Sequence, residues 1–190
     1  RAAFDGLTSQ LHVLAIQTAE PGPIAQAIAG IDIALWDMAA KRAGSPLYYH
    51  LAAEFDLPDL GDIASVPCYA SGINPDAPEK TALRARDDGY TAFKLKIGFE
   101  DELDLRNIKS MREALGYEAK IMADANQCWN LNKAKEMSKK LADFNPYWLE
   151  EPIAADRPVV EWRELGLASL VKLAAGETLR GGEFGDVCED

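Results

Sequence analysis

Charged side chains recur at a nearly constant interval in the second half of this sequence. Lys96, Asp124, Glu150 and Glu177 each end an apolar run, and the intervals between them are 28, 26 and 27 residues. Three carboxylates brought to one place repel one another unless a cation lies between them. Carboxylate oxygens suit Mg2+, whereas Zn2+ more often recruits His, and residues 63–190 contain no His. The pattern therefore predicts a Mg2+ site.

Two lysines lie close together in the apolar stretch YTAFKLKIG, residues 90–98. Side chains two positions apart on a strand share a face, so Lys94 and Lys96 are expected to point the same way. The same rule pairs Asp124 with Asn126. The residues expected to face packed helices on the other side of the sheet are Phe93, Leu95 and Ile97.

Each of these residues also has an ordinary structural interpretation. A single Asp or Glu at a strand end is more often a helix N-cap or a solvated rim residue, and lysines often mark an edge strand. Cys128 and Trp129 follow the third strand closely enough to line a pocket, but packing explains them equally well. Glu151 is expected to point to the face opposite Glu150. The shared period of four polar positions is what favours a functional site.

The elements that must position these residues alternate between strand and helix. Strand-like apolar runs are predicted at 64–70, 91–97, 119–125, 147–153 and 171–177. Helices are predicted at 77–89, 101–116, 132–144 and 157–168, with another beginning at 183–190. Nearly continuous apolar strands indicate a parallel sheet covered by helices. A doubly wound sheet reverses direction at a switch point, so the regular strand ends favour part of a (β/α)8 barrel, whose active site lies at those ends.

The first part of the chain has a different texture. Residues 23–43 carry apolar side chains at spacings of three and four, which predicts a helix that Gly44 and Pro46 end. Helix and loop continue to about residue 60. Two domains are therefore expected, at residues 1–62 and 63–190.

Composition excludes several classes of function. The chain has 190 residues, 48% of them hydrophobic, and a formal net charge of -11. That charge disfavours binding to nucleic acid or to an anionic membrane surface. No apolar run approaches the roughly 20 residues of a membrane span. The three cysteines form no CxxC pair, and no signal-peptide pattern is present, so a cytoplasmic protein with unpaired thiols is expected.

The ordered motifs resemble the mandelate racemase/muconate-lactonising branch of the enolase superfamily. These motifs are KLK, DAN, LEEP and AGE at residues 94–96, 124–126, 149–152 and 175–177. The stretch AIAGIDIALWDMAAKRAGSPLYYHLA resembles the last helix of the family's capping domain. The resemblance covers roughly residues 22–185. It implies an α+β capping domain followed by a modified (β/α)8 barrel, here about five strands of eight.

The resemblance also implies a chemistry. Enzymes of the family remove the proton α to a substrate carboxylate and stabilise the enediolate on Mg2+. By matching position, Lys96 would be the general base, Lys94 would contact the substrate carboxylate and help hold Lys96 neutral, and Asn126 would touch substrate. The metal ligands would be Asp124, Glu150 and Glu177. A lysine acts as a base only as the neutral amine, which a neighbouring ammonium, a metal ion and burial all favour.

Details of the motifs are most similar to sugar-acid dehydratases. DANQCW, LEEPIAADRP and AAGETLRGGEF favour a parent enzyme that dehydrates an aldonic or aldaric acid to a 2-keto-3-deoxy acid. A racemase, epimerase or muconate-type cycloisomerase is the alternative ending of the same first step. Because the second acid/base group of the family would lie on later strands, an inactive fragment is a further alternative. Family members often form homo-oligomers, which is the expectation for the parent.

Overall fold

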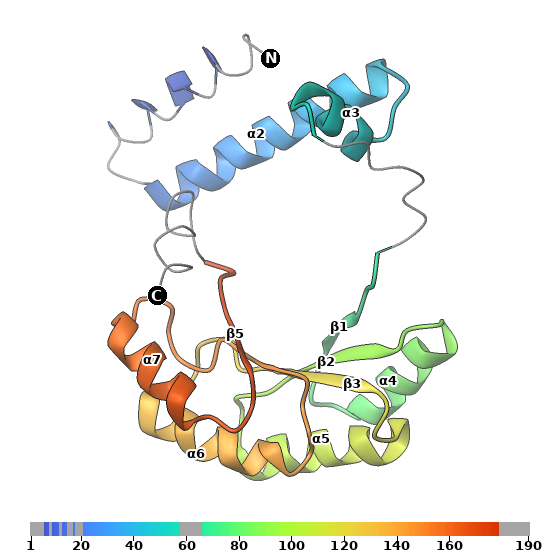
Figure 1. Cartoon of the computed structure of the whole chain (residues 1–190), viewed down its shortest axis with the longest axis vertical. Helices are drawn as coiled ribbons and strands as arrows, with labels where there is room; N and C mark the ends of the chain where they lie inside the picture. Colours follow the sequence, from blue (N-terminus) through green and yellow to red (C-terminus); the bar gives the residue numbers. More distant parts are fainter. Residues whose placement is uncertain are drawn as a thin grey trace. The chain divides into compact units, whose positions relative to one another are not determined.

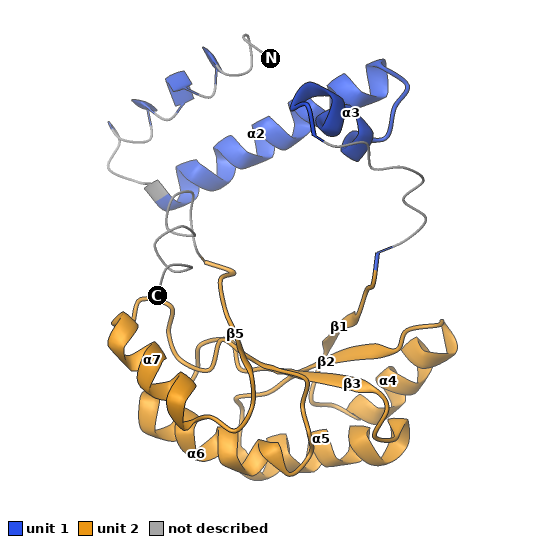
Figure 2. Cartoon of the chain, viewed as in Figure 1, with its two compact units in different colours: residues 1–66 blue, residues 67–190 orange. Residues whose placement is uncertain are grey.

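The computed structural model describes residues 21–57 and 66–178, together with some helical residues between 6 and 17. It divides the chain into two compact units, residues 1–66 and 67–190 (Figure 2). None of the helices in the described ranges has the length and apolar content needed to cross a membrane.

The first unit contains α2 (Pro21–Arg42) and α3 (Leu47–Glu54), so the helix predicted at 23–43 is confirmed. Gly44 has a φ of 64° and ends α2, because a left-handed residue lets the last carbonyls find backbone donors. The Trp36 ring lies 5.6 Å from that of Phe55 and 6.2 Å from that of His50. These aromatic contacts hold the end of α3 against α2.

The second unit is built on a parallel five-stranded sheet. Its strands are β1 (Ala70–Ile73), β2 (Ala92–Lys96), β3 (Lys120–Asp124), β4 (Leu149–Glu150) and β5 (Leu173–Ala174). Their order in the sheet is the order of the chain, β1-β2-β3-β4-β5, and every neighbouring pair is parallel. This unbroken order excludes a doubly wound sheet, in which the order reverses.

The connecting helices all lie on one side of the sheet (Figure 1). They are α4 (Pro78–Asp87), α5 (Asp101–Leu115), α6 (Leu131–Ala142) and α7 (Val159–Ala168). Crossovers of one hand place successive helices on one face when the strand order never reverses. The unit is therefore a partial (β/α)8 barrel, as the sequence predicted. We call the face of the sheet opposite these helices the open face.

Three predicted strands differ from the structure. The first was expected at 64–70, but β1 begins at Ala70, and 58–65 lie outside the described residues. Pro67 has no backbone N–H to donate to a ladder, which disfavours pairing at that position. β4 and β5 have two residues each instead of seven. Glu151 has a φ of 42°, which ends the extended backbone directly after β4. The helix predicted at 183–190 lies outside the described residues.

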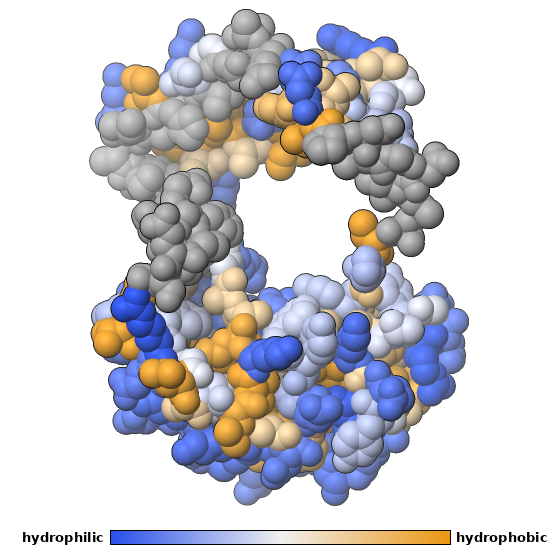
Figure 3. Space-filling view, viewed as in Figure 1, coloured by the Kyte–Doolittle hydropathy of each residue, from blue (hydrophilic) through white to orange (hydrophobic). Residues whose placement is uncertain are grey.

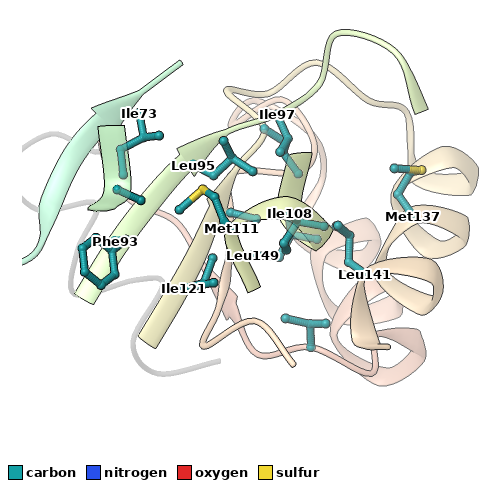
Figure 4. Packing of buried hydrophobic residues seen from close by; sticks show 14 residues of the cluster. Ile73, Phe93, Leu95, Ile97, Ile108, Met111, Ile121, Met137, Leu141 and Leu149 are labelled. Carbon is teal, nitrogen blue, oxygen red and sulfur yellow. The ribbon is translucent and has the colours of Figure 1, made fainter. Parts of the chain in front are cut away.

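The core lies between the sheet and the helices. Phe93, Leu95 and Ile97 are at most 3% exposed and pack in one cluster with Ile108 and Met111 of α5 (Figure 4). Alternation along a strand then turns the residues between them to the open face of the sheet. The predicted direction of these three side chains, toward the covering helices, is confirmed.

A buried arginine ties together the loops at the amino ends of the strands. Arg112 of α5 is 3% exposed, and its Nε donates to the carbonyl of Phe144 at 3.0 Å. Its Nη2 donates to Asn145 at 2.9 Å, and its Nη1 donates to Gly116 at 2.9 Å and Ala119 at 2.7 Å. The loops preceding β3 and β4 are thus held by one guanidinium.

The surface of the second unit is mostly hydrophilic, but apolar atoms reach it around α7 (Figure 3). Val160, Leu167 and Leu170 are 65%, 92% and 72% exposed. Single exposed apolar side chains are common on protein surfaces.

Candidate active site

The sheet register places three charged residues in one row. Lys96 pairs with Asp124, and Asp124 pairs with Glu150, so the row crosses the carboxyl ends of β2, β3 and β4. On β5 the row continues to Ala174, which pairs with Glu150. Glu177 lies three residues beyond that level, in the loop after β5, because β5 ends earlier than predicted. The nearly constant interval along the sequence therefore does not show that Glu177 lies beyond the level of Lys96, Asp124 and Glu150.

Lys94 and Lys96 face the same side, as predicted. Lys94 is 7% exposed, and its Nζ lies 2.5 Å from Oε1 of Glu150 and 3.3 Å from Oδ2 of Asp124. The Nζ of Lys96 lies 2.6 Å from the same Asp124 oxygen and 2.7 Å from Oδ1 of Asn126. One ammonium thus bridges two carboxylates, and the second ammonium closes the network.

The charges in this network stabilise one another. Burial lowers the pKa of Lys94, but the hydrogen bond to Glu150 and the charges of Glu150 and Asp124 outweigh it and raise that pKa above the usual lysine value. Burial raises the pKa of Asp124, but hydrogen bonds from Lys96 and the backbone N–H of Asn126, with both lysine charges, lower it below the usual value. Lys94 is therefore an ammonium and Asp124 a carboxylate at neutral pH.

Two aromatic residues support this network and were not predicted. The indole Nε1 of Trp148 donates to Oε2 of Glu150 at 2.9 Å. The Tyr69 ring lies 5.4 Å from Nζ of Lys94 and packs edge-on against Trp148 at 5.8 Å. Trp148 precedes Glu150 by two residues, and that spacing would have placed it on the same face. Tyr69 lies before β1 and carries no comparable signal.

A cavity of about 490 Å³ opens over these groups. Its lining includes Tyr69, Lys94, Lys96, Glu150, Glu151 and Glu177. Asp124 lies beneath it and is 1% exposed. A cavity with two ammonium groups and several carboxylates suits a small polar anion held together with a cation.

The backbone is constrained in the loops beside the cavity. Asn126, Gln127 and Glu151 have φ values of 45°, 63° and 42°. Positive φ is uncommon for residues other than glycine and costs of order 1–3 kcal/mol where the surroundings impose it. These loops follow β3 and β4, the strands that carry Asp124 and Glu150.

Glu151 departs from the sequence-based interpretation. It was expected to face away from the site, but it lines the cavity and is 2% exposed. Its carboxylate accepts hydrogen bonds from Nε2 of Gln127 at 2.8 Å and from the backbone N–H of Glu177 at 3.2 Å. Cys128 is exposed, and its Sγ lies close to Gly98.

The donor set fits a hard divalent cation in its chemistry, because it consists of carboxylate and amide oxygens. Asp124 and Glu150 already converge on one cationic centre, the Nζ of Lys94. Glu177 is exposed and does not join them. Within the described ranges, no three His, Cys, Asp or Glu side chains are gathered closely enough to hold a metal ion. Two of the three predicted ligands are thus brought together, and the third lies in the same cavity.

Comparison with known proteins agrees with this geometry. Residues 78–183, more than half of the chain, match the enolase C-terminal domain-like family. Residues 6–51 match the N-terminal domain of mandelate racemase/muconate lactonizing enzymes. The chain belongs to the mandelate racemase/muconate lactonizing enzyme family of the enolase superfamily. The predicted family membership is therefore confirmed.

Individual relatives of this family member include enzymes with different reactions. An L-talarate/galactarate dehydratase from Salmonella typhimurium is 38% identical over 182 residues, which are 93% of this chain and 44% of that protein. A crystal structure of a mandelate racemase/muconate lactonizing enzyme from Bordetella bronchiseptica RB50 is 50% identical, with a TM-score of 0.82, over 94% of this chain and 47% of that one.

A racemase from Streptomyces coelicolor A3(2), solved with bound magnesium, is 28% identical with a TM-score of 0.83. It is matched over 98% of this chain and 55% of that one. The chain thus spans about half the length of the proteins it matches. One structural relative of the chain was thus solved with magnesium. One sequence relative of the chain is a dehydratase of the sugar acids talarate and galactarate.

Proposed function

We propose that this protein is a Mg2+-dependent sugar-acid dehydratase, which removes the proton at C2 of an aldonic or aldaric acid. The observation that carries the proposal is the pair of lysines, Lys94 and Lys96, facing Asp124 and Glu150 at the carboxyl ends of the strands. The similarity to an L-talarate/galactarate dehydratase supports the substrate class. Because the chain spans less than half of that enzyme, the activity is proposed for the whole protein.

Lys96 is the proposed base. A lysine has a reference pKa of about 10.4, so it must lose its proton before it can accept one from carbon. In the present structure its Nζ is held by Asp124 and by Oδ1 of Asn126. Asp124 would release Lys96 when its oxygens bind a metal ion, and Asn126 would keep Nζ oriented. The proton then moves from C2 to Nζ, and the C–H electron pair moves into the substrate carboxylate.

Lys94 is proposed to stay charged throughout. Its Nζ lies among the carboxylates at the carboxyl ends of the strands, and as an ammonium it would oppose the second negative charge that develops on the substrate carboxylate. The proposed ligands of Mg2+ are Asp124, Glu150 and Glu177. When bound, Mg2+ supplies positive charge beside that carboxylate and makes proton loss at C2 easier.

The second half of the reaction expels the C3 hydroxyl. That hydroxyl leaves as water after it gains a proton, and the enol that remains tautomerises to a 2-keto-3-deoxy acid. Among the described residues that line the cavity, no histidine is available as the general acid. We propose that this acid comes from the part of the family barrel that follows β5.

A racemase is the second candidate, and the likeness to the Streptomyces coelicolor enzyme favours it. Its first step is the same, but a proton returns to C2 on the opposite face and no water is lost. The product therefore distinguishes the two candidates. A 2-keto acid indicates dehydration, whereas a C2 epimer indicates racemisation.

The test combines a binding and a reaction measurement. Calorimetric titration with Mg2+ should show heat that is lost in Asp124→Ala. Incubation with galactarate, talarate and other sugar acids in D2O should then show exchange at C2 and a 2-keto product by NMR, abolished in Lys96→Met. Lys109→Met, an exposed substitution on α5, is the matched control. A protein that binds Mg2+ but exchanges no C2 proton in the panel would contradict the proposed reaction.

A further inference from the structure

Three successive loops at the carboxyl ends of the strands are joined by one short chain of hydrogen bonds. The backbone N–H of Ala155 donates to Oε1 of Gln127 at 2.9 Å, and Nε2 of Gln127 donates to Oε2 of Glu151 at 2.8 Å. Oε1 of Glu151 accepts the backbone N–H of Glu177 at 3.2 Å. The chain therefore runs from the loop after β4 to the loop after β3, back to Glu151 at the end of β4, and from there to the loop after β5.

The two ends of this chain determine what must lie between them. Both ends, at Ala155 and Glu177, are backbone N–H groups, and each can only donate. Each end therefore needs an acceptor, and the bond between the two side chains needs one donor and one acceptor. Together the two side chains must supply three acceptors and one donor. One amide and one carboxylate supply that set, whereas two amides or two carboxylates do not. The polarity of the ends thus requires one residue of each type at positions 127 and 151.

A side chain of the wrong type at position 127 or 151 is expected to destabilise these loops. Glu151 is 2% exposed, so a donor or acceptor left unpaired at its side chain costs free energy. Backbone bonds add rigidity, because the N–H of Gln127 donates to the carbonyl of Glu151 at 2.7 Å, and the N–H of Glu151 donates to Ala174 at 2.8 Å. Gln127 and Glu151 both have positive φ, so the surrounding contacts fix their backbones.

We propose that Gln127 and Glu151 form a positioning pair that fixes the loop carrying Glu177. Glu177 lies beyond the short strand β5, and in the described part of the chain Glu151 is the side chain that bonds its backbone N–H. Glu151 acts through that bond and is not itself a ligand. The consequence for metal binding rests on the proposed function, whereas the hydrogen-bond pair does not.

The test uses Glu151→Gln, Gln127→Glu and the double variant. Glu151→Gln leaves an amide donor facing another N–H donor, and Gln127→Glu leaves one carboxylate facing another. The double variant swaps the two side-chain types and restores every bond in the chain. Amide hydrogen exchange measured by NMR at Ala155 and Glu177 should be about tenfold faster or more in each single variant. In the double variant it should return to within about twofold of the original rate.

A second measurement tests the effect on Glu177. Mn2+ titration followed by EPR should show affinity about tenfold weaker in each single variant and restored in the double variant. In a Glu177→Gln background, Glu151→Gln should weaken Mn2+ binding no further, because the pair acts through Glu177. Glu118→Gln is the matched control, since Glu118 is exposed and lies at the other end of the sheet.

The outcomes separate the possible failures. If exchange in the double variant is as fast as in the single variants, the polarity rule is overturned. If exchange follows the rule but Mn2+ affinity never changes, the positioning role is overturned and the pair is only structural. If the original protein binds no Mn2+, the proposed function fails, and the exchange rates still decide whether the pair exists.

Discussion

The two ends of the sheet use buried cations in opposite ways. At the amino ends, Arg112 donates to four backbone carbonyls between 2.7 and 3.0 Å, and these acceptors carry no net charge. At the carboxyl ends, Lys94 and Lys96 face the ionised carboxylates of Asp124 and Glu150. Backbone carbonyls cannot leave their positions, whereas carboxylates can exchange one cation for another. The first arrangement stabilises the fold, and the second is suited to binding.

The largest effect is expected at the amino end. Arg112→Met should lower the free energy of unfolding by about 3–5 kcal/mol, because several buried carbonyls lose a charged donor. Urea denaturation measures this, with Arg106→Met, an exposed substitution on the same helix, as the control within about 0.5 kcal/mol of the original. Equal stability of the two variants would show that the hydrogen bonds of Arg112 do not stabilise the fold.

A smaller and different effect is expected at the carboxyl end. Lys94→Met should cost about 2–3 kcal/mol without metal, because Asp124 and Glu150 lose their shared ammonium but keep Lys96 and Trp148 as donors. Saturating Mg2+ should recover more stability in this variant than in the original protein, since the ion no longer competes with Lys94. Urea unfolding with and without Mg2+ measures the difference. Lys172→Met, an exposed change near the amino ends, should respond to Mg2+ like the original.

One hydrogen bond from Trp148 supports Glu150 at the carboxyl end of the sheet. Trp148→Phe keeps most of the ring but deletes the Nε1 donor to Glu150, so Mg2+ affinity should fall by about fivefold, or 1 kcal/mol. Calorimetry measures it, and Trp162→Phe in α7 is the control. An unchanged affinity in Trp148→Phe would mean that the indole does not orient Glu150.

The smallest effect concerns a buried acid without a charged partner. Burial raises the pKa of Asp104, and Oδ1 of this side chain has no hydrogen-bond partner within the described ranges, while Oδ2 accepts the N–H of Gly98 at 2.8 Å. An acid with a raised pKa in the folded state destabilises it increasingly as pH rises above the unfolded value, about 3.9. Asp104→Asn should therefore match or exceed the original stability at pH 7, within about 1 kcal/mol.

That advantage should vanish as the pH falls below about 4, because both forms are then uncharged at this position. Urea midpoints measured from acid to neutral pH test the trend. A variant that is less stable by the same amount at every pH would show that the carboxylate contributes a hydrogen bond that Asn cannot replace.

Much of the fold followed from the sequence, because buried parallel strands and covering helices leave a regular apolar pattern. Strand lengths did not, since β4 ends where Glu151 adopts a positive φ, and among the described residues β5 pairs with β4 alone. An apolar pattern indicates which residues are buried, but it does not indicate which residues form hydrogen bonds to a neighbouring strand. The residues from 147 to 153 therefore looked like one strand.

The candidate site was predicted in its charged residues and missed in its supports. Lys94, Lys96, Asp124 and Glu150 come together because strand ends in a parallel sheet meet at one edge. Glu177 lies beyond that row, and a constant interval along the chain could not show it. The partners Trp148 and Gln127 depend on side-chain direction and loop conformation, which sequence spacing specifies only weakly.

The unbroken strand order also has a consequence for how the protein is made. Each strand pairs with the next one in the chain, through residues only 22 to 28 positions apart. Closing such short loops carries a small entropic cost, and ribosomes add about 5–20 residues per second. Each pairing can therefore form within seconds of the one before it. Lys94 and Lys96 are synthesised first, Asp124 and Glu150 follow one unit at a time, and the charged network is assembled in the order of translation.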